Sequence, residues 1–268
     1  MKVDFGIGLG SSVGLLGGAD ARKFMELVKM ADGYGAAAIG TYDSAFLGGD
    51  AYVRATLMAQ AAPRAQIGLR PSNPLTREPQ IMASFLASID QLTGGRTFLD
   101  IASGDSAVFN IGYPAASRAR IEDYVTCVRD LLAHGEATYQ GRAQRVRWTK
   151  EAIRSRVPIS ICAEGPKMLH LGGRIGDGVV AGTGLLSEVI RDTIARVHAG
   201  AREAGRVPGD VDIWFTARSS LHEDRRPRST TSRRRCRRSS TTRCASASTA
   251  STCPTHSGPG SRTTSTAT

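Results

Sequence analysis

The chain has 268 residues, with 35 lysines and arginines against 24 aspartates and glutamates, so its formal net charge is +11. At roughly 100–200 residues per domain, this is one large domain or two small ones, with enough chain to form a hydrophobic core. No run of about 18 apolar residues occurs, and the glycine-rich N-terminus is not typical of a signal peptide. We therefore expect a cytoplasmic protein with no membrane partner.

Apolar segments typical of strands alternate with segments of helical period throughout residues 1–221. Strands are expected at Val3–Leu9, Ala37–Tyr42, Ala65–Leu69, Thr97–Ala102, Val157–Ala163, Gly178–Ala181 and Val211–Thr216. Helices are expected at Ala19–Tyr34, Tyr52–Ala61, Gln80–Leu92, Arg118–Ala133, Pro166–Arg174 and Ser187–Ala204. The segment Ala137–Trp148 interrupts this alternation and is expected to form a small hairpin or an extended excursion.

This alternation predicts an α/β fold in which parallel strands are joined by helical crossovers. Glycine and polar residues cluster directly after the third to sixth strands, in the stretches PSNP, SGDS, EGPK and GTG. Such a distribution favours a (β/α)8 TIM-type barrel, whose sites lie at the carboxyl ends of many strands. A doubly wound open sheet, which would concentrate these residues at one switch point, is the alternative. With about seven strands, the barrel is incomplete.

Residues 222–268 differ sharply in composition from the rest of the chain. They contain ten arginines, no lysine and two acidic residues, a net charge of +8, and they lack Val, Ile, Leu, Met and all aromatic residues. Such a segment cannot bury enough apolar surface to offset its ordering entropy, so we expect a disordered basic tail. The predicted domains are therefore a barrel over residues 1–221 and a tail over residues 222–268.

The tail has two interpretations. It resembles an Arg/Ser-rich segment that binds nucleic-acid phosphates, and it also resembles a GC-rich gene translated out of frame. The change in composition is abrupt near Leu221, and no aromatic residue lies between the arginines to stack on bases. We favour the out-of-frame interpretation and do not expect a nucleic-acid partner.

Two segments after predicted strands carry candidate binding chemistry. PSNPLTREP at residues 71–79 presents Asn73, Thr76 and Arg77 in a proline-rich loop. In the second segment, Gly165 and Pro166 begin a predicted helix and Lys167 follows, and a helix N-terminus beside a lysine is suited to a phosphate group. An ordinary helix start with proline in the first turn is the alternative interpretation.

Several stretches together carry a resemblance to a known family. They are FGIGLG, the TYDS at Thr41–Ser44, SNPLTREP, IDQLTGGRTFLDIASGD and AEGPKMLHLGGRIGDGVV. The chain resembles the luciferase-like monooxygenase superfamily and, within it, the branch of deazaflavin-dependent methylenetetrahydromethanopterin reductases. The resemblance implies a cofactor pocket at the carboxyl mouth of the barrel, for coenzyme F420 or, alternatively, FMN. It implies an oxidoreductase that transfers a hydride between reduced deazaflavin and a small organic substrate, with an FMN-dependent monooxygenase as the alternative.

The resemblance also implies the residues of this pocket. The implied cofactor-binding residues are Pro71, Ser72, Asn73, Gly104, Asp105, Ala163, Glu164, Gly165, Pro166, Lys167, Met168, Gly182 and Thr183. Asp43, just after the second strand, is the implied catalytic residue, with capping of the next turn as its alternative role. The family places a bulge with a cis peptide bond before this segment, so we predict that the matching bond, Arg70–Pro71, is cis.

Three further expectations complete the interpretation. The five histidines lack metal-ligand spacing, so no metal site is expected. The resemblance leaves a homodimer open as the assembly, because members of the family are commonly dimers. An inactive truncated barrel, or nucleic-acid binding through the tail, remains the alternative to an enzyme.

Overall fold

The computed structural model describes residues 4–9, 21–148 and 154–217. Within them, seven parallel strands form one sheet in the order β1-β2-β3-β4-β7-β8-β9. These strands are β1 (Gly6–Leu9), β2 (Ala38–Thr41), β3 (Gln66–Ser72), β4 (Thr97–Ile101), β7 (Ile159–Ala163), β8 (Gly178–Ala181) and β9 (Asp212–Phe215). The predicted tail, residues 222–268, lies outside the described residues.

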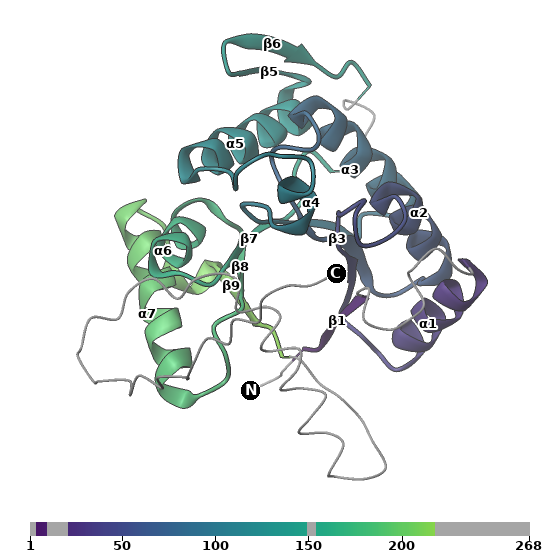
Figure 1. The fold of residues 1–268 in the computed structure, drawn as a ribbon, viewed down its shortest axis with the longest axis horizontal. Helices are drawn as coiled ribbons and strands as arrows, with labels where there is room; N and C mark the ends of the chain where they lie inside the picture. The colour runs from purple at the N-terminus through teal and green to yellow at the C-terminus, as the bar shows by residue number, and fades with distance from the viewer. Residues whose placement is uncertain (1–3, 10–20, 149–153, 218–268) are drawn as a thin grey trace, which may run out of the picture. The chain divides into compact units, whose positions relative to one another are not determined.

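Six long helices make the crossovers between successive strands. They are α1 (Ala21–Gly33), α2 (Ala51–Ala61), α3 (Pro79–Thr93), α5 (Arg118–His134), α6 (Pro166–Ile175) and α7 (Ser187–Glu203). The sheet curls, and the helices lie around its outer face (Figure 1). The fold is thus an α/β sheet curled as an incomplete TIM barrel, which confirms the predicted fold class. None of the described helices combines the length and hydropathy needed to cross a membrane.

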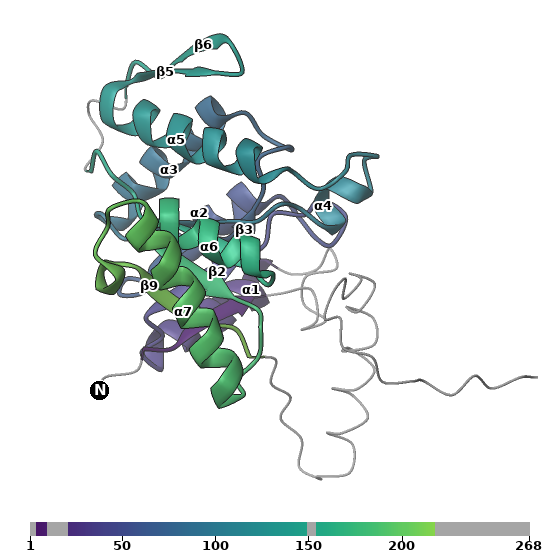
Figure 2. The ribbon, with the colours of Figure 1, turned by 90° about the vertical axis from the view of Figure 1, so that its left-hand side faces the viewer.

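The predicted hairpin is confirmed as the antiparallel pair β5 (Glu136–Tyr139) and β6 (Arg142–Arg145). It projects beyond α5 and α3 in both ribbon views (Figures 1 and 2). Gln144 anchors it, because its side-chain oxygen accepts from the backbone N–H of Gln80 at 2.9 Å and its amide nitrogen donates to Glu78 at 2.9 Å. These bonds satisfy polar groups at the N-terminus of α3, which lacks a side-chain cap.

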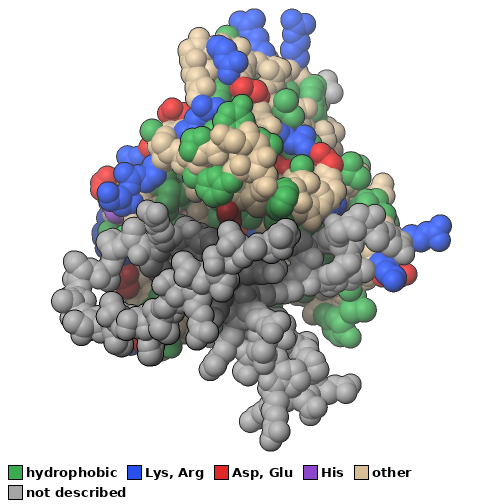
Figure 3. Space-filling view, in the orientation of Figure 1, with side chains coloured by type: hydrophobic (Ala, Val, Ile, Leu, Met, Phe, Trp, Pro, Cys, Tyr) green, Lys and Arg blue, Asp and Glu red, His purple; other side chains and the backbone are tan. Residues whose placement is uncertain are grey.

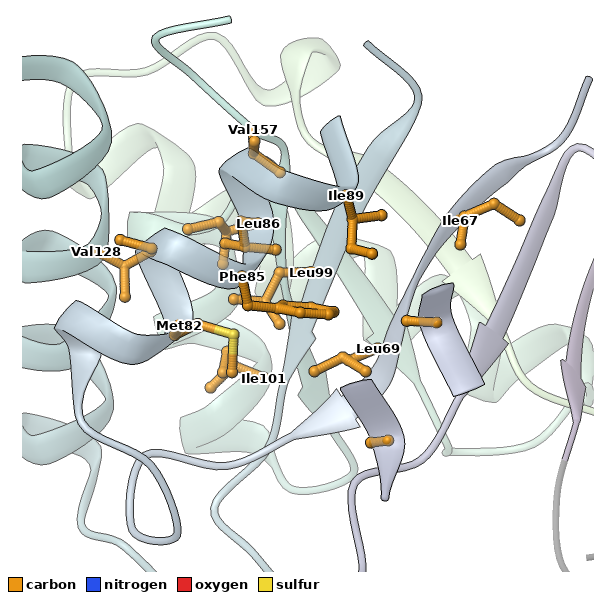
Figure 4. Packing of buried hydrophobic residues seen from close by; sticks show 14 of the residues in the cluster. Ile67, Leu69, Met82, Phe85, Leu86, Ile89, Leu99, Ile101, Val128 and Val157 are labelled. Carbon is orange, nitrogen blue, oxygen red and sulfur yellow. The ribbon is translucent and has the colours of Figure 1, made fainter. Parts of the chain in front are cut away.

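The core lies between the outer face of the sheet and the helices. Alternate residues of β3 and β4 face α3. Apolar side chains at helical spacing on α3 pack against them (Figure 4). The labelled members of this cluster are Ile67, Leu69, Met82, Phe85, Leu86, Ile89, Leu99, Ile101, Val128 and Val157. Each is at most 8% exposed, so the helix layer is held mainly by apolar burial.

The inner face of the sheet is different, because it combines glycines with a buried ion pair. Arg70 of β3 donates from Nε to Asp100 of β4 at 2.5 Å, and Asp100 is 0% exposed. The Arg70 guanidinium lies 4.7 Å from the ring centroid of Phe98 and 5.2 Å from that of Trp214. This face therefore joins β3, β4 and β9 through polar and aromatic contacts rather than through aliphatic packing.

Two features depart from the predicted elements. The third strand was expected to end at Leu69, but it continues to Ser72 through a register shift between Leu69 and Ser72. A bulge of this kind lets the strand pass Pro71, which has no backbone N–H to donate. The short helix α4 (Ser106–Phe109) was not predicted, since four residues are too few to show a helical period.

Candidate functional site

The candidate site lies where β2 and β3 end, at the carboxyl edge of the sheet. Ser72 donates from Oγ to Oδ2 of Asp43 at 2.7 Å, and the backbone N–H of Asp43 donates to the carbonyl oxygen of Pro71 at 3.0 Å. Ser72 is 1% exposed. The end of β2 is therefore joined to the bulge of β3 by two bonds, one of which orients the Asp43 carboxyl group.

The Asp43 carboxyl group is perturbed by its surroundings. Burial raises its pKa, while the hydrogen bond from Ser72 and the positive charge of Arg77 act in the opposite direction. Burial is the largest effect and the net pKa shift is upward. Asp43 is thus a carboxyl group that keeps its proton to a higher pH than an exposed aspartate.

The bulge carries the predicted cis peptide bond. Arg70–Pro71 is cis, which confirms the prediction. The following residue pair, Ser72 and Asn73, is buried. Pro71 and Ser72, both implied as cofactor-binding residues, thus lie beside Asp43.

Asn73 uses its side chain locally. Its Oδ1 accepts from the backbone N–H groups of Leu75 and Thr76 at 3.0 Å, and its Nδ2 donates to Oγ1 of Thr76 at 3.0 Å. These bonds form an Asx turn that closes the loop after β3. The Asn73 amide is therefore a turn-forming group in this structure, whereas the preceding Ser72 bonds to Asp43.

The loop after β4 meets the loop after β2. Gly104 has φ = +96°, and a Cβ there would lie 2.7 Å from the side chain of Val108, so the position requires glycine. Asp105 starts α4 without a side-chain capping bond. Ser106 lies 3.1 Å, Oγ to Oγ, from Ser44. The implied residues Gly104 and Asp105 are thus placed within two residues of a contact to the Asp43 loop.

The end of β7 leads into the N-terminus of α6. Gly165 is the N-cap residue of α6, no side chain caps it, and a Cβ at Gly165 would meet nothing within 4 Å. An uncapped helix N-terminus with open backbone has the donors that an anionic group needs. Of the implied residues Ala163 to Met168, Gly165 and Lys167 offer backbone N–H groups suited to a phosphate. Pro166 has no backbone N–H, and the N–H of Met168 donates to the carbonyl oxygen of Gly165 at 3.0 Å.

The end of β8 lies next to this terminus. A Cβ at Gly182 would lie 2.8 Å from Oε1 of Glu164, and Thr183 lies 3.0 Å, Oγ1 to Oγ1, from Thr193. Glycine at position 182 thus leaves room for the Glu164 side chain. The strand pairing of Ala163 with Ala181 brings the two segments side by side.

Pro166 and Lys167 also line a second feature, a hollow of about 690 Å³ on the helical layer. It lies between α5, α6 and α7, and its ionisable lining residues are Arg118, Glu122, Lys167, His170, Arg174, Arg196 and Glu203. Glu122 pairs with Arg174, and Glu203 lies 3.1 Å from His170. The Lys167 side chain is thus in a mainly basic groove outside the sheet.

Sequence reasoning missed four residues that organise the site. Ser44 and Ser106 end the stretches TYDS and SGDS, but neither serine was predicted as a site residue, because serine is common in any loop. Arg70 and Asp100 did give one, since each is a charged residue inside an otherwise apolar strand, and a charge in such a place is usually paired. Arg77 was noted as polar, and the structure stacks it on Tyr52, 3.7 Å from the ring centroid, and pairs it with Asp50 at 2.6 Å.

Comparison with known proteins places this geometry in a family. The family model of the luciferase-like monooxygenases matches residues 1–248, so the chain belongs to this family. The predicted family is thereby confirmed.

Two curated relatives and one solved structure are similar to part of this chain. The chain is 31% identical over 179 residues to a 5,10-methylenetetrahydromethanopterin reductase of Methanolobus tindarius, covering 65% of this chain and 54% of the relative. It is 27% identical over 154 residues to an F420-dependent glucose-6-phosphate dehydrogenase of Microbacterium testaceum, covering 54% of this chain and 46% of the relative. The chain therefore spans about half the length of these curated relatives.

The solved structure is that of the coenzyme F420-dependent tetrahydromethanopterin reductase of Methanopyrus kandleri. Its TM-score is 0.72 at 22% identity, over 85% of this chain and 69% of that one. At this identity the likeness shows a shared fold.

Proposed function

We propose that this protein is an F420-dependent oxidoreductase that transfers a hydride between reduced deazaflavin and a small organic substrate. The observation that carries the proposal is the Asp43–Ser72 pair beside the bulge of β3, in a chain whose curated relatives include F420-dependent enzymes. The proposed location is the cytoplasm.

The residues of the site divide into two groups by their chemistry. The backbone N–H groups of Gly165 and Lys167 at the start of α6 are the proposed donors to the phosphate of the cofactor. Gly104 leaves room for the side chain of Val108, and Gly182 leaves room for that of Glu164. Pro71, Ser72 and Asp105 lie along the edge where the ring would be held. Bound F420 supplies hydride chemistry at C5 of the deazaflavin, for which the protein provides orientation and exclusion of water.

Asp43 is the proposed proton donor. Reduction of a substrate leaves negative charge on the substrate heteroatom, and a proton held at Oδ1 of Asp43 can neutralise it. Ser72 fixes the other oxygen, Oδ2, through its 2.7 Å hydrogen bond. The raised pKa of Asp43 increases the fraction of the acid form near neutral pH.

Cofactor binding is tested first, by titrating the protein with F420 and, separately, with FMN. We expect F420 to bind at least about tenfold more tightly, which corresponds to about 1.4 kcal/mol. Gly165→Asp is the matched variant, since aspartate is a good N-cap and preserves α6 but places a negative charge where the phosphate would bind. Weaker F420 binding by the variant supports the proposal, and equal binding by both proteins contradicts it.

The role of Asp43 is tested by the rate at which the best acceptor of a panel oxidises reduced F420. We expect Asp43→Asn to lower kcat by about 10²- to 10⁴-fold. Ser72→Ala should lower the rate less and move the alkaline limb of the pH profile upward, because its hydrogen bond lowers the pKa of Asp43. An unshifted profile in Ser72→Ala would show that the group titrating in the alkaline limb is not the carboxyl group bonded to Ser72.

An FMN-dependent monooxygenase is the second candidate, because the family is that of the luciferase-like monooxygenases and the resemblance implies FMN as the alternative cofactor. The two functions differ in their need for oxygen. Turnover with FMN that consumes oxygen, together with tighter binding of FMN than of F420, would favour the monooxygenase. Turnover with F420 under anaerobic conditions would favour the oxidoreductase.

A further inference from the structure

The bulge of β3 carries an arginine beside the candidate site. The register of β3 against β4 shifts between Leu69 and Ser72. Within the shift, the two residues Arg70 and Pro71 lie opposite the single residue Asp100. A bulge interrupts the ladder of backbone hydrogen bonds, and Pro71 has no N–H to donate to it. This part of β3 therefore has fewer backbone bonds to β4 than a regular strand pair would have.

A buried ion pair spans this bulge. Nε of Arg70 donates to Oδ2 of Asp100 at 2.5 Å, and the two side chains are 14% and 1% exposed. Many lysines and arginines instead project from the outer surface of the molecule (Figure 3), where water solvates their charge. Because charge-assisted hydrogen bonds are the stronger kind, the pair ties the bulge to β4 at the point where the backbone ladder is interrupted.

The rest of the Arg70 side chain is enclosed by other strands of the inner face. Its guanidinium lies against the rings of Phe98 on β4 and Trp214 on β9. A Cβ at Gly40 of β2 would lie 2.5 Å from Cβ of Arg70, and a Cβ at Gly6 of β1 would lie 2.8 Å from its Nη1. Arg70 thus contacts β1, β2, β4 and β9, and this close packing fixes the position of its side chain.

The two residues that follow Arg70 are the ones that hold Asp43. The carbonyl oxygen of Pro71 accepts from the backbone N–H of Asp43 at 3.0 Å, and Oγ of Ser72 donates to Oδ2 of Asp43 at 2.7 Å. Peptide units are rigid, and consecutive Cα atoms are only about 3.8 Å apart. A displacement of Arg70 would therefore move both partners of Asp43.

Arg70 has no need to act on Asp43 through its charge. Burial is the largest effect on the pKa of Asp43, and the charges that act on this pKa belong to Arg77, which lowers it, and Asp50, which raises it. Arg70 instead faces Asp100, whose charge opposes its own. An effect of Arg70 on Asp43 therefore passes through the backbone of the bulge and the serine hydroxyl that follows it.

We propose that Arg70 is a positioning residue for the Asp43 carboxyl group: paired with Asp100, it holds the bulge of β3 at the place from which Ser72 donates to Asp43. The role of Asp43 as proton donor belongs to the proposed function, on which this inference rests. The hydrogen bonding of Asp43, however, can be measured without cofactor or substrate, so the two can be tested separately.

The pKa of Asp43 is the first measurement, by NMR of 13C-labelled aspartate carboxyl groups, with the signal assigned by its absence in Asp43→Asn. Ser72→Ala should raise this pKa by about 1, because it removes a hydrogen bond to the ionised form. Burial raises the pKa of both Tyr52 and Tyr124, the two phenols on which the charge of Asp43 acts. These phenols therefore keep their protons while Asp43 titrates.

Arg70→Met should raise the pKa of Asp43 by a similar amount. The double variant Arg70→Met/Ser72→Ala should raise it no further than either single variant, since both substitutions remove the same hydrogen bond. Arg70→Lys keeps a cation opposite Asp100 and should have a smaller effect, because lysine lacks the planar fork that stacks between the two rings. It replaces Arg70→Met in the same measurements if the latter does not fold.

Arg154→Met is the matched control, because Arg154 forms a comparable buried ion pair at the amino edge of the same sheet. Its Nε donates to the two carboxylate oxygens of Asp90 at 3.1 and 3.0 Å, and Asp90 is 0% exposed. Its Nη2 donates to the carbonyl oxygen of Thr97, the first residue of β4, at 2.8 Å. This variant should lose stability but leave the pKa of Asp43 unchanged.

Turnover is the second measurement. Arg70→Met should lower kcat with reduced F420 by about 10- to 100-fold and change KM for the acceptor by less than about threefold, because a displaced proton donor affects the chemical step. An unchanged pKa of Asp43 in Arg70→Met, additive effects of the two substitutions, or an equal shift in Arg154→Met would each overturn the proposal. The expected shifts in a protein that does not turn over F420 would refute the proposed function while sustaining the role of Arg70.

Discussion

At the scale of single residues, the most informative position is Asp100, a carboxyl group buried in the inner face of the sheet. Burial raises its pKa to about 6, against the opposing effects of Arg70 and of a hydrogen bond from Ser160. An acid whose pKa is higher in the folded than in the unfolded state stabilises the fold when protonated. That stabilisation is lost as the pH rises through the folded-state pKa.

Asp100→Asn therefore has a predictable pH signature. The free energy of unfolding of the natural protein should fall relative to that of the variant between about pH 4 and pH 6, by on the order of 3 kcal/mol. The pairing with Arg70 is already part of this pH-dependent difference, because only the ionised form of Asp100 is a charge partner for Arg70. Denaturant unfolding at several pH values measures the difference, and parallel curves for the two proteins would contradict the assignment.

At the scale of elements, the packing of α6 on α7 depends on two glycines. A Cβ at Gly173 would overlap the backbone of Val197, and a Cβ at Gly200 would overlap the backbone of His170. The helix backbones therefore approach each other directly at this crossing. Because α6 also presents Gly165 to the candidate site, the crossing positions part of that site.

Gly200→Ala should separate these helices. We expect a loss of about 1–3 kcal/mol in the free energy of unfolding, since neither backbone can yield without moving its helix. Gly33→Ala, at the end of α1 where a Cβ would meet nothing within 4 Å, is the control and should be neutral or slightly stabilising. Equal stability of the two variants would show that the helices adjust without cost.

At the scale of the whole molecule, a cofactor that binds only the folded protein must raise its stability. At a free concentration of 100 times its Kd, F420 should add about 2.7 kcal/mol to the free energy of unfolding. FMN at the same concentration should add less, if F420 is the cofactor. Thermal unfolding with each compound measures this without any substrate, and a larger shift with FMN would favour the monooxygenase.

The order of elements and the class of fold followed from the sequence alone. Short apolar runs such as Thr97–Ala102 were distinguished from segments of helical period such as that of α3, and their alternation predicts parallel strands. The cis form of the Arg70–Pro71 bond was predicted from the family resemblance. The short helix α4 could not, because its form depends on Gly104 and on burial of Val108.

Only the tertiary structure decided how the site is assembled. Ser72 and Asp43 are 29 residues apart in the chain, Arg70 and Asp100 are 30 apart, and Ser44 and Ser106 are 62 apart. No local period reports such pairs, since they meet only when neighbouring strands take their register. The sequence by itself therefore determined which segments reach the carboxyl edge of the sheet. The register and the loop contacts determined which side chains there hold one another in place.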